Sequence, residues 1–107
     1  MDIREIQHKA VILHLKCRDE IGIRLDGILL FGSYAKGNPR KDSDIDIAAL
    51  SYSFGKSRFK EGSLINTLAH DIDTRFEVIP VNTNEYCDQP SISPIIFEIQ
   101  KNHIWLF

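Results

Sequence analysis

Two apolar runs with a glycine-containing turn between them constrain the fold of this chain more than any other feature. Residues 28–31 are apolar on both faces, a pattern typical of an interior strand. The run ends at Gly32-Ser33, and a polar stretch with Gly37 and Pro39 separates it from a second apolar run over residues 45–50. We therefore expect two strands, joined by a loop that begins with one short helix after Gly32.

Hydrophobic spacing predicts a helix before these strands. Its buried stripe recurs at steps of three and four residues: Ile3, Ile6, Ala10, Leu13 and Cys17. Gly22 is the expected C-terminal stop of this helix, and the first strand then covers residues 25–31.

The second half of the chain continues the alternation of helices and strands. Residues 51–62 are polar and basic and predict a mobile loop, after which Ser63 caps a helix with Leu64, Ile65, Leu68 and Ile72 inward. Residues 73–81 predict a third strand, with Phe76, Val78 and Pro80 on one face and Asp73, Arg75, Glu77 and Ile79 on the other. Pro80 suggests an edge position or the end of the strand.

The C-terminal part adds one more helix and a short apolar end. We expect a loop over residues 82–90, then a helix opened by Ser93-Pro94 with Ile95, Ile96 and Ile99 buried. Residues 104–107 form a short strand or an apolar tail that closes the core, although an exposed Trp105 or Phe107 would mark a partner surface. The order of elements predicts an α/β fold.

Length, charge and cysteine content restrict the class of protein. With 107 residues, of which 43% are hydrophobic, we expect a single domain over residues 1–107 with a real core. The net charge of −2 argues against a dedicated nucleic-acid binder, although Lys56, Arg58 and Lys60 leave a local basic patch open. Cys17 and Cys87 form no disulfide framework, and no apolar run reaches membrane-spanning length. We expect a cytoplasmic protein without a membrane partner.

The turn after the first strand has the composition of a phosphate site. Gly32 allows close approach to the backbone, Ser33 supplies a hydroxyl group, and Lys36 can add positive charge. Lys36 could equally be a solvated lysine. Ser43 is a further candidate substrate contact, or a residue that hydrogen-bonds only its local backbone.

Carboxylates close to this turn have the pattern of a metal site. Asp44 and Asp46 stand two residues apart on a predicted strand, so they point to the same face. Mg²⁺ prefers oxygen ligands and commonly binds one or two carboxylates plus substrate phosphates. Glu77 is the expected third carboxylate of a two-metal site, with Asp73 as the alternative on the same face.

Less specific interpretations remain for these residues. Asp44 could belong to the turn over residues 41–44, although that interpretation leaves Asp46, between two isoleucines, unexplained. Glu77 could be an exposed strand residue paired with Arg75 or Lys101.

Two other motifs do not fit their usual chemistry. Gly55-Lys56-Ser57 imitates the end of a P-loop, but Leu50 occupies the position of the first glycine. His70-Asp71 has no further histidine at metal-binding spacing, so a helix-end histidine is the better interpretation.

Gly32-Ser33-x-Ala35-Lys36-Gly37, followed by Ser43-Asp44-x-Asp46-Ile47, resembles the signature of the minimal nucleotidyltransferases of the DNA polymerase β-like superfamily. The resemblance implies a nucleotidyltransferase fold with a small mixed sheet of about four strands flanked by helices. It also implies transfer of a nucleoside monophosphate, with AMP expected, from an NTP, with ATP expected, to an acceptor hydroxyl with release of pyrophosphate.

By position, the resemblance gives each motif residue a role. Gly32 and Ser33 would hold the triphosphate, while Asp44 and Asp46, together with Glu77, would bind two Mg²⁺ ions, and Glu77 would activate the acceptor. The family more often has Asp at the third position. Members of this size are often antitoxins that act on a small helical toxin. The alternative is a non-catalytic module of the same fold that captures its partner stoichiometrically.

Overall fold

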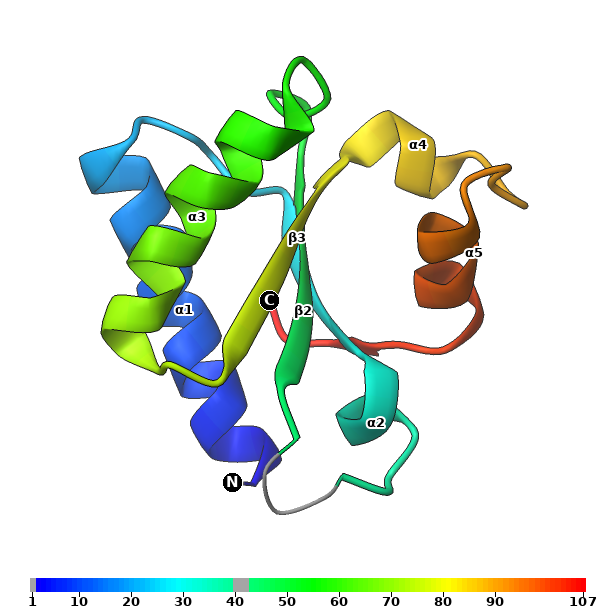
Figure 1. Cartoon of the computed structure of the whole chain (residues 1–107), viewed down its shortest axis with the longest axis horizontal. Coiled ribbons are helices and arrows are strands. Elements are labelled where there is room, and N and C mark those ends of the chain that lie inside the picture. The colour runs from blue at the N-terminus through cyan, green and yellow to red at the C-terminus, as the bar shows by residue number, and fades with distance from the viewer. Residues whose placement is uncertain (1, 40–42) are drawn as a thin grey trace.

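A four-stranded mixed sheet forms the centre of the computed structural model, which describes residues 2–39 and 43–107 (Figure 1). Its strands are β1 (Gly27–Phe31), β2 (Ile45–Ser51), β3 (Phe76–Asn82) and β4 (Ile104–Trp105), in the order β3-β2-β1-β4. β1 is antiparallel to both β2 and β4, whereas β2 and β3 are parallel. The predicted α/β class and the mixed sheet of about four strands are confirmed.

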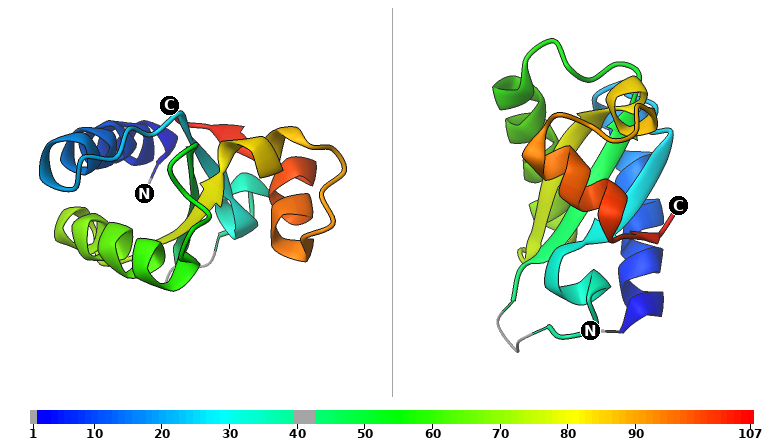
Figure 2. Two further views of the ribbon diagram at one scale, coloured as in Figure 1. Left: turned by 90° about the horizontal axis from the view of Figure 1, so that it is seen from above. Right: turned by 90° about the vertical axis from the view of Figure 1, so that its right-hand side faces the viewer.

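Helices cover both faces of this sheet. α1 (Ile3–Glu20) and α3 (Arg58–Ile72) lie together on one face, while α4 (Thr83–Cys87) and α5 (Pro94–Lys101) lie on the other (Figure 2). α2 (Gly32–Ala35) follows β1 directly. Alternate residues of β1 and β2 therefore face different helices: Ile28, Leu30, Ile45 and Ile47 pack toward α1 and α3, and Leu29, Phe31, Ala48 and Leu50 toward α5.

The predicted N-terminal helix is confirmed as α1. The Asp2 side chain accepts a hydrogen bond from the Glu5 N–H at 3.0 Å, which caps the first turn. Gly22 has a φ of 66° just beyond the last turn, where a residue without a β carbon carries little strain. The stripe from Ile6 to Cys17 is fully buried, and burial raises the pKa of the Cys17 thiol to about 11. Among the described residues, no helix is long and apolar enough to cross a membrane.

β3 is an edge strand, and the outer backbone groups of its first half are already hydrogen-bonded. The Asn66 side chain accepts from the Val78 N–H and donates to the Val78 carbonyl, both at 2.8 Å. His70 Nε2 lies 2.9 Å from the Phe76 carbonyl oxygen. Pro80 stands two residues after Val78, so its backbone nitrogen is on the same side of the strand, turned away from β2. A proline, which has no N–H, therefore costs no hydrogen bond within the sheet here. The predicted edge position of Pro80 is confirmed.

The prediction of a loop over residues 51–62 holds only for residues 52–57, because β2 includes Ser51 and α3 already begins at Arg58. The Glu61 carboxylate accepts hydrogen bonds from the N–H groups of Gly55, Lys56 and Ser57, at 3.0 to 3.4 Å. These bonds satisfy the donors that precede the helix. Ser63 is consequently not the cap but an internal residue of α3.

Three details near the C-terminus differ from or qualify the predictions. Residues 82–90 are not all loop, because they include the short helix α4. The Asn82 side chain caps this helix by accepting a hydrogen bond from the Asn84 N–H at 2.8 Å. Ser93 caps α5 as predicted, but Ile95 is 37% exposed whereas Ile96 and Ile99 are buried. In the last segment Leu106 is buried and closes the core, and Trp105 and Phe107 are about half exposed. A partner surface at these two aromatic residues stays a prediction.

Asp73, the alternative third acid, is instead a structural ion-pairing residue. Its carboxylate accepts hydrogen bonds from the Arg75 guanidinium and from Lys9 Nζ, the latter at 2.8 Å. These bonds, led by that of Arg75, hold the pKa of Asp73 well below its usual range. The side chain is only 8% exposed, and its ion pairs connect α1 to the turn between α3 and β3.

We expect Asp73→Asn to lower the free energy of unfolding at pH 7 by about 1–3 kcal/mol, because the ion pairs with Lys9 and Arg75 are lost. A depressed carboxyl pKa stabilises the folded state above the unfolded pKa of about 4, and this contribution is lost as the pH falls toward the folded value. The difference between wild type and variant should therefore shrink below about pH 4. Urea denaturation at pH 7 and pH 3 measures it, and a difference that stays constant would contradict the assignment.

Candidate active site

The turn after β1 lies directly against Asp46. Gly32 has a φ of 71°, and a β carbon built on it would overlap Asp46 Oδ2. The contact follows from the sheet register, in which Phe31 is paired with Asp46 across the antiparallel strands. Glycine is therefore required at position 32 for two reasons, namely the left-handed backbone and the missing side chain. The Gly32 turn is thus in direct contact with the first part of β2.

Asp46 and Glu77 are paired residues of the parallel strands β2 and β3. Asp46 alternates with the fully buried Ile45 and Ile47, so its side chain is on the α5 side of the sheet. Burial, followed by the negative charge of Asp44, raises the pKa of Asp46. Burial also raises the pKa of Glu77, as do a hydrogen bond to Asp44 and the charges of Asp46 and Asp44, while His70 acts in the opposite direction. The three predicted carboxylates are thus neighbours at one end of the sheet.

The carboxylates are close together, but they are not arranged around a common point. Within residues 2–39 and 43–107, no group of three or more His, Cys, Asp or Glu side chains could hold a metal ion as it stands. Asp44 and Glu77 both line one cavity beside β3, and the nearby Asp44 is one of the causes, after burial, that raise the pKa of Glu77. The predicted role of these residues as metal ligands stays a prediction.

The predicted phosphate residues lie around the same end of the sheet. Ser33 is half-buried in α2, and its carbonyl accepts a hydrogen bond from the Asn38 N–H at 3.1 Å. Ser43 is half-buried and directly precedes Asp44. Residues 40–42, which the predicted loop and turn include, lie outside the described part of the chain.

Lys36 directly follows α2 as its C-cap and forms an ion pair with Glu98 of α5, with 3.1 Å between Nζ and Oε1. Both side chains are nearly half exposed, so the pair contributes little to stability. Sequence reasoning missed Glu98 because nothing local connects a residue of the last helix with a turn about sixty positions earlier.

A cavity of about 470 Å³ adjoins the carboxylates on the outer side of β3. Asp44 and Glu77 line one part of it, and the other residues come from α3, from the turn before β3 and from β3 itself: Asn66, His70, Thr74, Phe76, Val78 and Ile79. Sequence reasoning did not find Asn66 or Thr74, because their proximity to the site depends on the packing of α3 on the edge strand. His70 is in the last turn of α3, as predicted.

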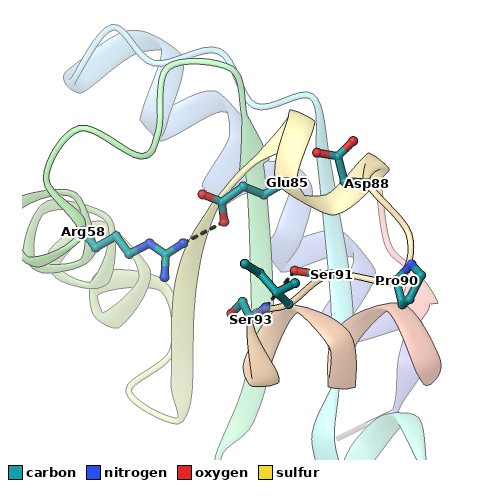
Figure 3. A pocket seen from close by; sticks show the side chains of 7 residues that line it. Arg58, Glu85, Asp88, Pro90, Ser91 and Ser93 are labelled. Carbon is teal, nitrogen blue, oxygen red and sulfur yellow. Dashed lines mark hydrogen bonds and ion pairs between the residues drawn. The ribbon is translucent and has the colours of Figure 1, made fainter.

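A larger cavity lies at the other end of β3, away from the carboxylates (Figure 3). It measures about 640 Å³ and lies between the start of α3 and the segment from α4 to α5. Arg58 and Glu85 form an ion pair of 2.7 Å across it. It contains none of the residues that the motif singles out, so its size does not make it the candidate active site.

Comparisons with known proteins agree with the fold and with the motif. The family model described as "Polymerase beta, Nucleotidyltransferase" matches residues 9–107. A protein of Methanocaldococcus jannaschii, named "Putative protein adenylyltransferase MJ1305", is 28% identical over 83 residues, which are 78% of this chain and 48% of that protein. The chain therefore spans about half the length of this relative.

Two solved structures are similar over 94% of this chain and 72% of their own. One is a toxin–antitoxin structure with AMP-PNP, which superposes with a TM-score of 0.57 at 28% identity. The other is a toxin–antitoxin MntA-HpeT mutant in which two aspartates, two residues apart, are replaced by glutamates, with a TM-score of 0.55 at 26% identity.

Proposed function

Because the chain belongs to the polymerase beta nucleotidyltransferase family, we propose that it transfers AMP from ATP to an acceptor hydroxyl group and releases pyrophosphate. The observation that carries this proposal is the contact of the Gly32 turn with Asp46, beside Asp44 and Glu77. A turn for phosphate and a set of acids for a cation then meet at one end of the sheet. The AMP-PNP in one similar structure supports an adenine nucleotide as donor.

Asp44, Asp46 and Glu77 would hold two Mg²⁺ ions in this proposal. The donors fit a hard cation, because all are carboxylate oxygens, Asp46 is paired with Glu77 across β2 and β3, and Asp44 lines the same cavity as Glu77. When bound, Mg²⁺ supplies charge neutralisation for the phosphates and for the attacking and leaving oxygens. The aspartate pair replaced in one similar structure has the same two-residue spacing as Asp44 and Asp46.

The chain's own residues would position the reactants. The Gly32 turn, the Ser33 hydroxyl group, Lys36 and Ser43 would bind the triphosphate. Glu77, whose pKa is raised, is suited to accept a proton from the acceptor hydroxyl group. The acceptor oxygen then forms a bond to the α-phosphorus, and the bond from that phosphorus to the bridging oxygen of pyrophosphate breaks. Such a reaction is accelerated mainly by positioning and charge stabilisation.

A small helical toxin protein is the proposed acceptor, since both similar structures are toxin–antitoxin structures. The alternative is a non-catalytic module that binds the same partner stoichiometrically. One observation favours the alternative: the acids, as they stand, do not converge on a metal position in the described part of the chain.

Labelled ATP distinguishes these two functions. The chain is incubated with Mg²⁺, the product of the gene next to its own, and ATP labelled at either the α- or the γ-phosphate. Nucleotidyl transfer predicts that the partner retains the α-label but not the γ-label, and that EDTA prevents labelling. Tight binding of the partner without any label would support the module and contradict the enzyme.

We expect Lys36→Met to raise the KM for ATP by about tenfold with a small change in kcat, because it removes a charge that binds phosphate equally in the ground and transition states. The thermal midpoint should hardly change, since Lys36 and Glu98 are both exposed. Steady-state kinetics measures both constants.

Glu98→Gln is the matched control for Lys36→Met. It also removes the ion pair but keeps the lysine, so the KM for ATP should stay the same or fall. An equal rise of KM in both variants would show that the ion pair, rather than the lysine charge, matters.

A further inference from the structure

The end of the molecule opposite the candidate active site has no part in the proposed chemistry. Asp46 and Glu77 are paired near the beginning of β2 and β3. The last residues of these strands, Ser51 and Asn82, are also paired, and the length of β2 places them about 20 Å from its first residue. The loop after β2 and the first turn of α3 lie beyond this end (Figure 1). The segment before β1 is here as well, because the Ser51 hydroxyl group donates a hydrogen bond to the Arg24 carbonyl at 2.8 Å.

Three acidic side chains of this end hold its segments together. Asp26 accepts hydrogen bonds from the Tyr52 N–H and from the hydroxyl group at the start of α4, at 3.0 and 2.8 Å. Glu61 accepts from the three N–H groups that precede α3. Glu85 is paired with Arg58 across the larger cavity (Figure 3). Each of these carboxylates therefore already has partners within the chain.

The cations and aromatic rings of the same end point to the solvent instead. The surface that we call the cationic end consists of Arg24, Tyr52, Lys56, Phe59 and Lys60. Its three basic side chains are exposed and form no ion pair within residues 2–39 and 43–107. Phe59 and Tyr52 are 87% and 62% exposed, more than any other Phe, Tyr or Trp side chain in that part of the chain. One exposed ring is ordinary, but two rings among three unpaired cations complement a surface that is apolar and acidic.

The chemistry of the cationic end favours a protein partner over a nucleic acid. Backbone N–H groups at a turn or a helix start commonly bind phosphate, but those of residues 55–57 are occupied by Glu61. The net charge of the chain is −2, so a long polyanion would also meet an unfavourable overall charge. A few cations around two rings suit a folded partner in which carboxylates surround an apolar recess.

We propose that the cationic end is a docking surface for an acidic patch on the partner protein, remote from the reacting atoms; this inference rests on the proposed function. The Phe59 ring would enter an apolar recess of the partner, and Lys56 and Lys60 would face carboxylates around it. A partner that contacts this surface and the candidate active site together must span about 20 Å, the length of about 13 residues of helix. Docking here contributes to affinity for the partner and not to the chemical step.

Phe59→Ala and the double variant Lys56→Glu/Lys60→Glu test the proposal. The probe is the product of the gene next to that of this chain, titrated by isothermal calorimetry at low and at high salt. Phe59→Ala should raise the dissociation constant at least about tenfold. The double variant should weaken binding most at low salt and remove most of the salt dependence, because it reverses the charges that attract the partner. All three side chains are exposed, so the thermal midpoints should hardly change.

Steady-state transfer of α-labelled ATP distinguishes docking from catalysis. In both variants the KM for the partner should rise, while kcat and the KM for ATP change less than about twofold. A general distortion of the protein would not produce this separation. Phe97→Ala and Lys101→Glu are the matched controls, because they change an exposed phenylalanine and an exposed lysine on α5. Both should leave the affinity for the partner unchanged.

Unchanged partner binding in both test variants would overturn the inference and leave the proposed function intact. Weakened binding without label transfer by wild type would support the docking surface and contradict the proposed enzyme. Absence of binding to wild type would contradict the proposed partner and this inference together. If Phe59→Ala instead weakens binding of an oligouridine of about twelve nucleotides and not of the partner, the surface binds nucleic acid, which overturns the inference. A wild-type dimer that Phe59→Ala dissociates in sedimentation velocity, with partner binding unchanged, would overturn it as well.

Discussion

Asp46→Asn should abolish nucleotidyl transfer, with kcat lowered by more than about 100-fold. Loss of a residue that merely supports a metal ligand already costs 10- to 100-fold, and Asp46 is proposed as a ligand itself. Asparagine keeps the shape of the side chain but loses the charge that a cation requires. Asp44→Asn should have the same effect, and steady-state transfer of α-labelled ATP measures both.

The same substitution should not destabilise the fold. The folded state raises the pKa of Asp46, through burial first and the charge of Asp44 second, so the ionised carboxylate is disfavoured there at neutral pH. A neutral asparagine removes this cost, and the thermal midpoint should stay equal or rise. Mg²⁺ should raise the midpoint of wild type but not that of Asp46→Asn. Asp19→Asn, on the exposed surface of α1, is the control and should leave activity unchanged. Undiminished turnover in Asp46→Asn would contradict the mechanism.

Gly32→Ala should lower activity by about 100-fold, because its β carbon would occupy the position of Asp46 Oδ2 and displace that carboxylate. The left-handed backbone, with a φ of 71°, adds a cost of about 1–2 kcal/mol to folding. The measurement is transfer activity alongside the free energy of unfolding from urea denaturation.

Substitutions at two other glycines distinguish the effect of backbone strain from the effect of the steric clash with Asp46. Gly22 has a φ of 66° and Gly37 a φ of 78°, yet a β carbon on either meets nothing within 4 Å. Gly22→Ala and Gly37→Ala should therefore lose about as much stability as the backbone strain alone costs, and Gly22→Ala should keep full activity. If Gly22→Ala and Gly32→Ala lose activity equally, the contact with Asp46 has no functional importance.

The strands and the acidic pair could be predicted because their signals are local. An apolar run bounded by turn residues identifies a buried strand, and alternation within residues 45–50 places Asp46 on the opposite face from the two isoleucines. The position of Glu77 beside Asp46 also follows once β2 and β3 are parallel neighbours.

What the sequence could not reveal depends on contacts between distant segments. α3 starts early because the Glu61 carboxylate accepts hydrogen bonds from the N–H groups of Gly55, Lys56 and Ser57. The polar composition of this stretch resembles that of a loop and gives no sign of the helix start. The ion pair of Lys36 with Glu98 and the cavity beside Glu77 require the packing of α5 and α3 against the sheet. Hydrophobic periodicity shows that a helix packs against the core, but it does not show which polar residues of the helix come to lie beside a site on the sheet.

Crystals soaked with Mn²⁺ and AMP-PNP test the central claim most directly, because anomalous scattering locates the metal without assumptions about the reaction. The account predicts Mn²⁺ between Asp44, Asp46 and Glu77, with the triphosphate against the Gly32-Ser33 turn. Metal bound elsewhere, or a nucleotide that contacts neither the turn nor these acids, would contradict it.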